Sequence, residues 1–432
     1  MCGVNNVDAV HTRGVRMGGT GRPGEVVAAL GDPLRLASGS VLPNRVAKAA
    51  LEEFLAVDGQ LPGDELIALH RRWARGGAGL LITGHVMVDG RAVADPRDVV
   101  LEAGTDLEPF RRWASAARSG GGQVWMQINH PGRVVFADQG GLAWSASAKR
   151  VEMGAFTRLY ATPVAMTGEQ IAEVVARFAV TAAQAERAGF DGVEVHAAHG
   201  YLIGQFLSPL VNRRADGYGG DLAARARLLL EVVAAVRGAV SPGFAVGVKL
   251  NTADFQRGGF QPQDAAEVIG MLSGAGVDLV ELSGGSLESL AIMGHAADES
   301  TLAREAYFLD AAASILADAP LPVMITGGVR RLPVARRVLE SGASVVGVGT
   351  ALAVDPDLPH AWIAGEHAEA TPVRVNWPDK KLSSAAVQAL VHARMEDLAA
   401  DRDRSTGPLR ALLTERLRRR PALRRYRKWG KA

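Results

Sequence analysis

The sequence contains one cysteine, Cys2, in 432 residues. A single thiol excludes an internal disulfide framework, a zinc site built from several cysteines and a cysteine-ligated iron–sulfur cluster. The sequence also lacks an apolar run long enough to span a bilayer, and its first residues lack the hydrophobic segment of a secretion signal. We therefore expect a cytoplasmic protein that does not insert into a membrane.

The charges nearly balance, with 48 basic and 46 acidic side chains and a formal net charge of +2. This balance does not by itself point to an acidic partner. About half of the residues (48%) are hydrophobic, which is enough for a sizeable core without disulfides. Residues 1–33 are rich in glycine and show no periodicity, so we expect a flexible N-terminal segment there.

The stretch around residues 189–227 sets the pattern for the rest of the chain. Residues 193–195 form a short apolar-rich run typical of a buried strand, and residues 222–240 show helical apolar spacing. Similar strand-then-helix units recur along the chain. The predicted strands are 46–51, 79–88, 123–129, 193–195, 245–251, 277–283, 322–326 and 344–349. The predicted helices are 64–75, 107–119, 167–187, 222–240, 262–273, 305–317, 333–341 and 358–364.

Eight such units predict a (β/α)8 TIM barrel over residues 34–370. A doubly wound sheet is the competing fold, but no GxGxxG motif follows a predicted strand. We expect Asp64 to cap the first helix. The loop 131–163 is too long for a simple connection and is predicted to form a lid or a hairpin.

Residues 371–432 form a predicted helical C-terminal extension. Residues 409–429 combine a leucine stripe with many arginines and lysines, a pattern that can bind membranes or nucleic acid. No aromatic residues are interleaved with the charges as nucleic-acid binding would require, so we favour a helix packed on the barrel or on a neighbouring subunit. We expect no nucleic-acid partner.

In a barrel, reactive groups collect at the C-terminal ends of the strands. His196, His199 and Tyr201 directly follow the fourth predicted strand. The two imidazoles could bind a metal together with Glu194, or could be hydrogen-bonded inside a packed core. A third interpretation, which we favour, is that they donate hydrogen bonds to a developing oxyanion while Tyr201 supplies a proton.

Further groups at the strand ends suit a phosphate and a polar ring. Gly327 and Gly328 end the seventh strand, and Gly349 and Thr350 end the eighth, where this fold often binds phosphate. Lys249 is either half of an ion pair or a cation that faces an electron-rich ligand. Gln127 is either a buried amide with its own partners or a hydrogen-bonding group for a heterocycle.

Several segments, in this order, resemble the Old Yellow Enzyme family of FMN-dependent ene reductases, usually described as NADH:flavin oxidoreductase/NADH oxidase. These are LPNRVAKAALEE, WMQINHPGR, GFDGVEVHAAHGYLIGQFLSP, NRRADGYGG, VGVKLN, ELSGG and ITGGVR. The similarity covers residues 36–359, and HAAHGYL followed by YGG is highly specific. The resemblance implies a barrel with FMN at its C-terminal mouth, NADH or NADPH as hydride donor, and ping-pong reduction of α,β-unsaturated carbonyl compounds.

The resemblance also implies residue roles. His196 and His199 would bind the substrate carbonyl oxygen, and Tyr201 would protonate its α-carbon. Gln127 would bond the pyrimidine edge of the flavin, and Lys249 would face N1 and the C2 carbonyl. The remaining flavin contacts fall into two groups. The isoalloxazine would be lined by Ala49, Ala50, Leu51, Glu52 and Gly84, and the phosphate would be held by Gly327, Gly328, Gly349 and Thr350.

The sequence departs from the family at two flavin positions. Glu52 stands where relatives have Thr or Cys, and an ionised carboxylate there would disfavour reduced flavin and lower its potential. Thr350 replaces the usual arginine beside the phosphate. One alternative is therefore a flavin-binding barrel with reduced or lost activity, and another is a phosphate-binding barrel without flavin. A 2,4-dienoyl-CoA reductase-like enzyme is a third alternative, against which the single cysteine argues. Chains of this family commonly associate, so a homo-oligomer is also an expectation.

Overall fold

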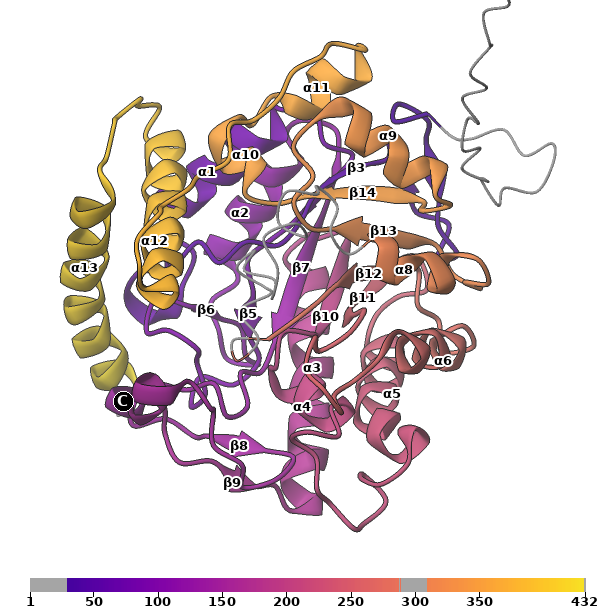
Figure 1. Cartoon of the computed structure of the whole chain (residues 1–432), viewed down its shortest axis with the longest axis vertical. Coiled ribbons are helices and arrows are strands. Elements are labelled where there is room, and N and C mark those ends of the chain that lie inside the picture. Colours follow the sequence, from indigo (N-terminus) through magenta and orange to yellow (C-terminus); the bar gives the residue numbers. More distant parts are fainter. Residues whose placement is uncertain (1–28, 287, 289–308, 431–432) are drawn as a thin grey trace, which may run out of the picture.

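The computed structural model describes residues 29–430, apart from 287 and 289–308. Most of the flexible segment predicted for residues 1–33 lies outside the described residues, as does the beginning of the helix predicted at 305–317. Figure 1 shows a central barrel surrounded by helices, with two long helices of the C-terminal extension lying along one side.

Eight parallel strands pair in a closed ring, because the last strand of the series also pairs with the first. The predicted (β/α)8 barrel is therefore confirmed. The barrel strands, in order around the ring, are β3 (Val46–Lys48), β4 (Leu80–Ile82), β7 (Gln123–Asn129), β10 (Gly192–Ala197), β11 (Ala245–Asn251), β12 (Leu279–Ser283), β13 (Val323–Thr326) and β14 (Val345–Val348).

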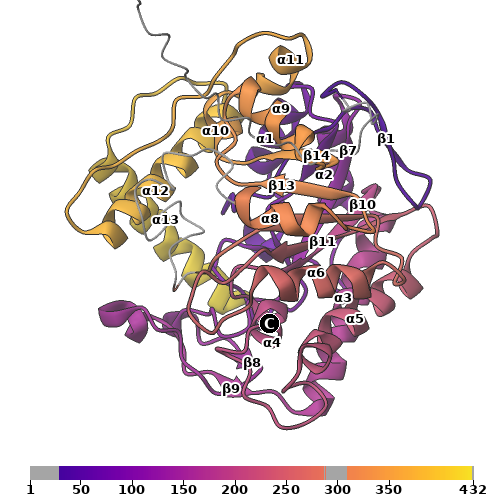
Figure 2. The ribbon, with the colours of Figure 1, turned by 45° about the vertical axis from the view of Figure 1, so that its right-hand side comes forward.

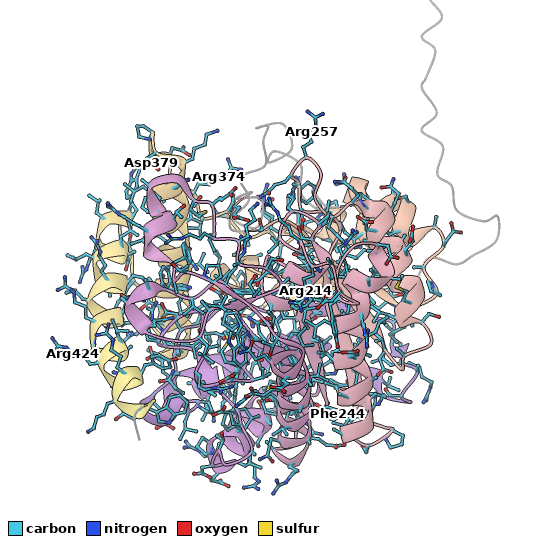
Figure 3. All side chains as sticks on the ribbon, turned by 90° about the horizontal axis from the view of Figure 1, so that it is seen from below. Arg214, Phe244, Arg257, Arg374, Asp379 and Arg424 are labelled. Atoms are coloured by element: carbon cyan, nitrogen blue, oxygen red, sulfur yellow. The ribbon has the colours of Figure 1, made fainter. Side chains whose placement is uncertain are left out.

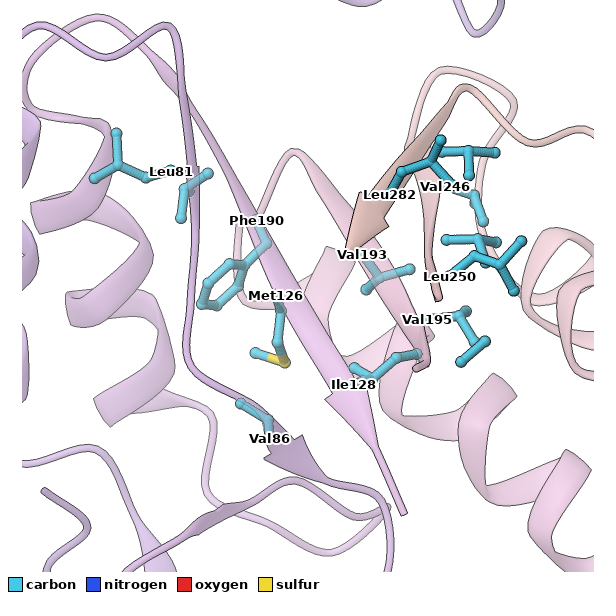
Figure 4. Close-up of a cluster of buried hydrophobic side chains, with 14 of the residues drawn as sticks. Leu81, Val86, Met126, Ile128, Phe190, Val193, Val195, Val246, Leu250 and Leu282 are labelled. Atoms are coloured by element: carbon cyan, nitrogen blue, oxygen red, sulfur yellow. The ribbon is translucent and has the colours of Figure 1, made fainter. Parts of the chain in front are cut away.

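The helices that follow the strands bury their apolar faces against the outside of the barrel. Alternate residues of each strand point outward and contact these helices. Figure 4 shows Val193 and Val195 of β10 in this outer apolar layer, beside Ile128 of β7. The outer helices are α1 (Asp64–Ala74), α2 (Glu108–Arg118), α3 (Gly168–Arg187), α5 (Leu222–Ala239), α6 (Pro262–Leu272), α8 (Leu309–Leu316), α9 (Leu332–Glu340) and α11 (Leu358–Ile363). Short helices α4 (Leu202–Leu207) and α10 (Ala351–Val354) lie between them in the chain.

The starts of α3 and α1 are capped in different ways. Thr167 caps α3 by accepting the Gln170 N–H, and the Gln170 side chain accepts the Thr167 N–H in return. The prediction that Asp64 caps α1 is wrong, because Gly63 is the N-cap and Asp64 is the first helical residue. Asp64 still places a negative charge at the positive end of the helix dipole.

The inside of the barrel has an apolar lower layer. Trp125 fills much of it, and a Cβ on Gly247 would lie 2.8 Å from the Trp125 ring. Glycine at 247 therefore makes room for the indole. Because side chains alternate along a strand, Gln127 lies one layer above Trp125, and Glu281 lies one layer above Leu279. The polar layer thus faces the C-terminal mouth and rests on an apolar floor.

The single strand predicted at 79–88 divides into two. β4 ends at Ile82, and β5 (Val86–Met87) pairs instead with the end of β7 and with β6 (Val99–Val100). Gly84 lies at the break, where its N–H donates to Glu53 Oε1 at 2.9 Å and a Cβ would clash at 1.8 Å with Glu53 Oε2. The predicted continuous strand is therefore wrong because the Glu53 carboxylate holds the backbone at this glycine.

The long loop after β7 contains β8 (Trp144–Ser145), which pairs with β9 (Val164–Ala165). The two strands are parallel, so the loop is not a hairpin, which requires antiparallel strands. Figures 1 and 2 both show this pair at the bottom of the molecule, on the side of α4. We call residues 131–165 the lid segment.

The C-terminal extension forms two helices, α12 (Lys380–Ala399) and α13 (Pro408–Trp429), which lie side by side in Figures 1 and 2. α12 packs on α1, and α13 is fixed to the barrel by Tyr426, whose hydroxyl donates to the Gly90 carbonyl at 2.9 Å. The basic helix therefore packs on the barrel, as the sequence analysis favours. In the part of the chain that the structure describes, no helix combines the length and apolarity needed to cross a bilayer.

Candidate active site

Three rings meet where β10 ends. The His196 ring centroid lies 5.0 Å from the centroids of both His199 and Tyr201, edge to face in each case. His196 is the fifth residue of β10, and the other two lie on the turn that leads into α4. The local sequence thus places all three predicted catalytic side chains within one small cluster.

The backbone at His199 is in the left-handed region, with φ of +60°. For a residue with a side chain this conformation costs on the order of 1 kcal/mol, so its surroundings must hold it. Asn251 Oδ1, at the end of β11, accepts the backbone N–H of His199 at 3.2 Å. Ser283 Oγ, at the end of β12, lies 2.9 Å from Nε2 of the His199 ring. Two neighbouring strands therefore fix the direction of this imidazole.

Both imidazoles of the cluster are neutral at neutral pH. Burial lowers their pKa values well below the usual range, and nearby charges, including Lys249, lower them further. His196 Nδ1 accepts the Ala198 N–H at 3.2 Å, so the proton of the neutral ring is on Nε2. When Ser283 donates its hydroxyl proton to His199 Nε2, the His199 proton is on Nδ1. Each ring then keeps one N–H to donate to a ligand.

A carboxylate contacts the tyrosine of the cluster. The Tyr201 hydroxyl donates to Glu52 Oε1 at 2.6 Å, and His85 Nδ1 lies 3.7 Å from the same oxygen. Burial raises the pKa of Tyr201 well above its usual range, and the Glu52 charge raises it further. Glu52, predicted only as a flavin neighbour, is therefore also the hydrogen-bond partner of the predicted proton donor.

His85 is a buried cation beside this pair. Its Nε2 atom lies 3.5 Å from Asp98 Oδ1, and both side chains are almost fully buried. Burial alone would lower the pKa of His85, but the charges of Asp98 and Glu52 outweigh it and raise the pKa to about 9. The predicted strand 79–88 includes His85, but the sequence analysis gave no role to either His85 or Asp98, because no local pattern connects the two residues.

Replacing His85 with glutamine is expected to reduce the loss of stability at alkaline pH. The folded pKa of about 9 exceeds the unfolded value of 6.5, so the stabilisation is fully present below pH 6.5 and is lost as pH rises through 9. It amounts to roughly 3 kcal/mol. Urea unfolding of wild type and variant at pH 6 and pH 9.5 checks this. Equal losses in both proteins would contradict it.

The polar layer inside the barrel contains two buried pairs. Gln127 Nε2 donates to Glu194 Oε2 at 2.6 Å, and Lys249 Nζ donates to Glu281 Oε1 at 2.5 Å. Burial and the neighbouring Glu281 raise the pKa of Glu194 well above its usual range. The register brings these residues together, since Glu194 is opposite Gln127 and Lys249 is opposite both His196 and Glu281. Sequence analysis missed Glu281, although the period of two along β12 points it inward.

A second buried lysine was also missed. Lys48, at the end of β3, donates to the Ile82 carbonyl at 2.9 Å and lies 3.5 Å from Glu53 Oε1. Its ammonium is 4.1 Å from the centre of a Trp73 ring. Burial lowers the pKa of Lys48 to about 8, against the opposing effect of Glu53. The lysine in the middle of VAKAA on a predicted strand was the available signal for this site.

The ends of β13, β14 and β3 lie close together. A Cβ on Gly349 would lie 3.6 Å from Leu51 Cδ2, with no nearer atom, and Ala49 donates its N–H to the Val348 carbonyl at 3.0 Å. Gly327 and Gly328 have φ of +136° and +72°, which favours glycine. Ala50 and Thr350 belong to the same strand ends and are half-buried and exposed, respectively.

Thr326 adds a buried hydroxyl at this edge. Its Oγ1 atom has no hydrogen-bond partner within the described part of the chain. A buried, unpartnered hydroxyl beside two glycine turns is suited to an anionic oxygen, because the hydroxyl and the flanking N–H groups are all donors.

Comparison with known proteins gives a consistent result. Residues 29–367 match the NADH:flavin oxidoreductase / NADH oxidase family. The NADH-dependent flavin oxidoreductase iliE of Neonectria sp. is 37% identical over 354 residues, covering 76% of this chain and 46% of that protein. A protein of the same name from Hypocrea jecorina is 34% identical, covering 76% and 87%. This chain thus spans less than half of the first relative but most of the second.

Solved structures of similar proteins have the same barrel fold. Morphinone reductase in complex with tetrahydroNAD is 26% identical, with a TM-score of 0.64, and the match covers 82% of this chain and 93% of that one. The old yellow enzyme homologue from Zymomonas mobilis shares the fold. It is 23% identical, with a TM-score of 0.68, and the match covers 79% of this chain and 94% of that one. The chain belongs to the NADH:flavin oxidoreductase / NADH oxidase family, and is an FMN-dependent oxidoreductase of the Old Yellow Enzyme type.

Proposed function

We propose that this enzyme reduces activated C=C bonds of α,β-unsaturated carbonyl compounds with hydride from NADH or NADPH, in two half-reactions that use one pocket in turn. The observation that carries the proposal is the cluster of two neutral imidazoles and a tyrosine hydroxyl at the end of β10. The neutral His196 ring carries its proton on Nε2 and the phenol has a proton to give. His199 also has an N–H to donate when Ser283 donates its hydroxyl proton to His199 Nε2. A conjugated carbonyl needs both kinds of group, one at its oxygen and one at its α-carbon.

The residues at the mouth fit FMN. Lys249 and Gln127 supply a cation and an amide in the polar layer, where the heterocycle would lie, although each is hydrogen-bonded to a buried carboxylate in this structure. The Thr326 hydroxyl and the turn at Gly327 and Gly328 offer donors to the phosphate. We assign the isoalloxazine contacts of Ala49, Ala50, Leu51 and Gly84 and the phosphate contacts of Gly349 and Thr350 on the same basis. When bound, FMN supplies the hydride for the β-carbon.

The protein groups then have distinct tasks. His196 and His199 hold the carbonyl oxygen through their N–H groups and stabilise the negative charge that grows on it. Tyr201 gives its proton to the α-carbon and is left as a phenolate next to Glu52, a like charge that favours its reprotonation. His85, positively charged below about pH 9, offsets part of this repulsion.

A flavin-binding barrel without activity is the second candidate, and Glu52 is the observation that favours it. Its carboxylate raises the pKa of Tyr201 and so makes the phenol a weaker acid. The two candidates separate in one experiment. NADH, or NADPH in a parallel sample, is added anaerobically to the purified, FMN-loaded protein, and 2-cyclohexen-1-one follows. Bleaching of the flavin band by either reductant and its return with the enone support the proposal, whereas failure of reduction by both, or of reoxidation by the enone, contradicts it.

Replacing Glu52 with threonine is expected to make flavin reduction easier, because it removes a negative charge from beside the flavin site. The expected rise in reduction potential is on the order of 30 mV, which is about 1.4 kcal/mol for a two-electron couple. Dye-equilibrated reduction of FMN-loaded wild type and variant measures it. Glu52→Gln, which keeps the shape and loses the charge, is the matched control and should give a similar rise. An unchanged potential in both variants would rule the idea out.

A further inference from the structure

A basic groove lies between the lid segment and the loop that joins α4 to α5. Its volume is about 360 Å³, within the range of small-molecule sites. The backbone N–H of Arg213 donates to Ser147 Oγ at 2.9 Å, and this hydrogen bond joins the two walls of the groove. The groove is lined by Ser147, Ala148, Lys149, Arg150, Glu152 and Arg213.

The charges in this groove are not balanced. Lys149 Nζ lies 3.7 Å from Glu152 Oε1, which is the one carboxylate of the lining. No described carboxylate lies within 4 Å of the guanidinium of Arg150 or Arg213. The adjacent Arg214 differs, since Asp216 and two backbone carbonyls accept its hydrogen bonds. Arg214 thus has a structural role, whereas two guanidinium groups in the groove are available to an anion.

Hydrogen bonds from a buried arginine hold the backbone of the groove in place. Arg133, almost fully buried, donates to the backbone carbonyls of Lys149 and Arg150 at 3.3 and 2.8 Å. The second terminal nitrogen of the Arg133 guanidinium donates to Glu288 Oε2 at 2.6 Å. Glu288 Oε1 accepts the backbone N–H of Glu152, also at 2.6 Å. The loop that presents the basic side chains is therefore fixed to the barrel mouth through buried charge-assisted hydrogen bonds.

The same arginine connects the groove to the catalytic cluster. The backbone N–H of Arg133 donates to Gln205 Oε1 at 3.2 Å. Gln205 Nε2 in turn donates to the backbone carbonyl of Gly200 at 2.8 Å. Gly200 directly precedes Tyr201. A chain of hydrogen bonds thus joins the loop that carries Lys149 and Arg150 to the residue before Tyr201.

We propose that the groove formed by Lys149, Arg150 and Arg213 binds the phosphate groups of a long reactant whose other end lies at the catalytic cluster. This inference rests on the proposed function. Guanidinium groups match phosphate oxygens with paired hydrogen bonds, and their charge compensates that of a diphosphate. A simple enone has nothing to place there. Two reactants of this chemistry carry an adenosine diphosphate remote from the reacting carbon: the dinucleotide reductant and an enoyl thioester of coenzyme A.

Direct binding tests the proposal without turnover. The FMN-loaded enzyme is titrated by calorimetry with coenzyme A and, separately, with ADP-ribose, the part of NADH that lacks nicotinamide. The variants are Arg150→Gln and Arg213→Gln. Arg424→Gln is the matched control, because Arg424 is exposed on α13 and lies far from Arg214, the residue next to Arg213, in Figure 3. Each groove variant should raise the Kd about tenfold or more, the scale of one charge-assisted hydrogen bond, and the control should not.

The ligand that binds identifies the source of the phosphates. Binding of coenzyme A indicates an acyl thioester substrate, and binding of ADP-ribose indicates the dinucleotide. Either result, with the loss in both groove variants, supports the proposal. If neither ligand binds, or if the groove variants bind as tightly as the Arg424→Gln control, the proposal is wrong. A wild-type enzyme that binds a ligand in this way but fails to reduce flavin or enone would contradict the proposed function alone.

Discussion

Replacing Tyr201 with phenylalanine is expected to slow reoxidation of the reduced enzyme by an enone about 10²–10⁴-fold, the usual contribution of a positioned proton donor. Reduction of the enzyme by NADH needs no proton from this phenol and should stay within about threefold of wild type. The effect should therefore fall on one half-reaction. Stopped-flow spectroscopy of the flavin band measures the two steps separately.

The variant should still fold. The lost hydroxyl donates to Glu52, whose side chain is 30% exposed and can be hydrated in its place, so the cost is on the order of 1 kcal/mol. Tyr160→Phe is the matched control, since Tyr160 is a buried tyrosine of the lid segment that stacks on Phe136. Slow reoxidation in both variants, or equal slowing of both half-reactions in Tyr201→Phe, would show that the phenol is not the proton donor.

The barrel was predictable because its signal is local and repeated. β7 and β11 have the predicted bounds, and most other strands differ by one to three residues. The errors have physical causes that lie elsewhere in the chain. The break at Gly84 depends on Glu53, which is 31 residues away, and the parallel pairing of β8 and β9 joins the middle of the lid segment to its end. Neither contact leaves a periodic pattern in the sequence.

The clustering of His196, His199 and Tyr201, the proposed catalytic residues, was predictable for the same reason, since they lie within six residues of chain. Their partners were not. Glu52 is 149 residues from Tyr201, and Glu281 is 32 residues from Lys249. Such pairs depend on strand register and side-chain direction, which the order of elements leaves open. The ion pair that the sequence analysis offered as one interpretation of Lys249 is present, but the sequence did not identify Glu281 as its partner.

That pairing makes Lys249→Met the second substitution with a large expected effect. The Lys249 and Glu281 side chains are 4% and 0% exposed, so removal of the lysine leaves a buried carboxylate without its cation. Breaking a buried pair in this way costs about 3–5 kcal/mol. Urea unfolding of the flavin-free protein should show this loss. A variant as stable as wild type would mean that the ion pair contributes little.

The double variant Lys249→Met/Glu281→Gln separates stability from cofactor binding. It should recover most of the lost stability, because no buried carboxylate is left without a cation at position 281, and a neutral amide can share a hydrogen bond with Glu194. FMN binding should not recover. A cation beside the polar edge of the bound flavin is worth about tenfold or more in affinity for FMN, and both variants lack it. Fluorescence titration with FMN measures this. If the double variant binds FMN as tightly as wild type, Lys249 serves the barrel interior alone, and the assignment of its ammonium to the flavin is wrong.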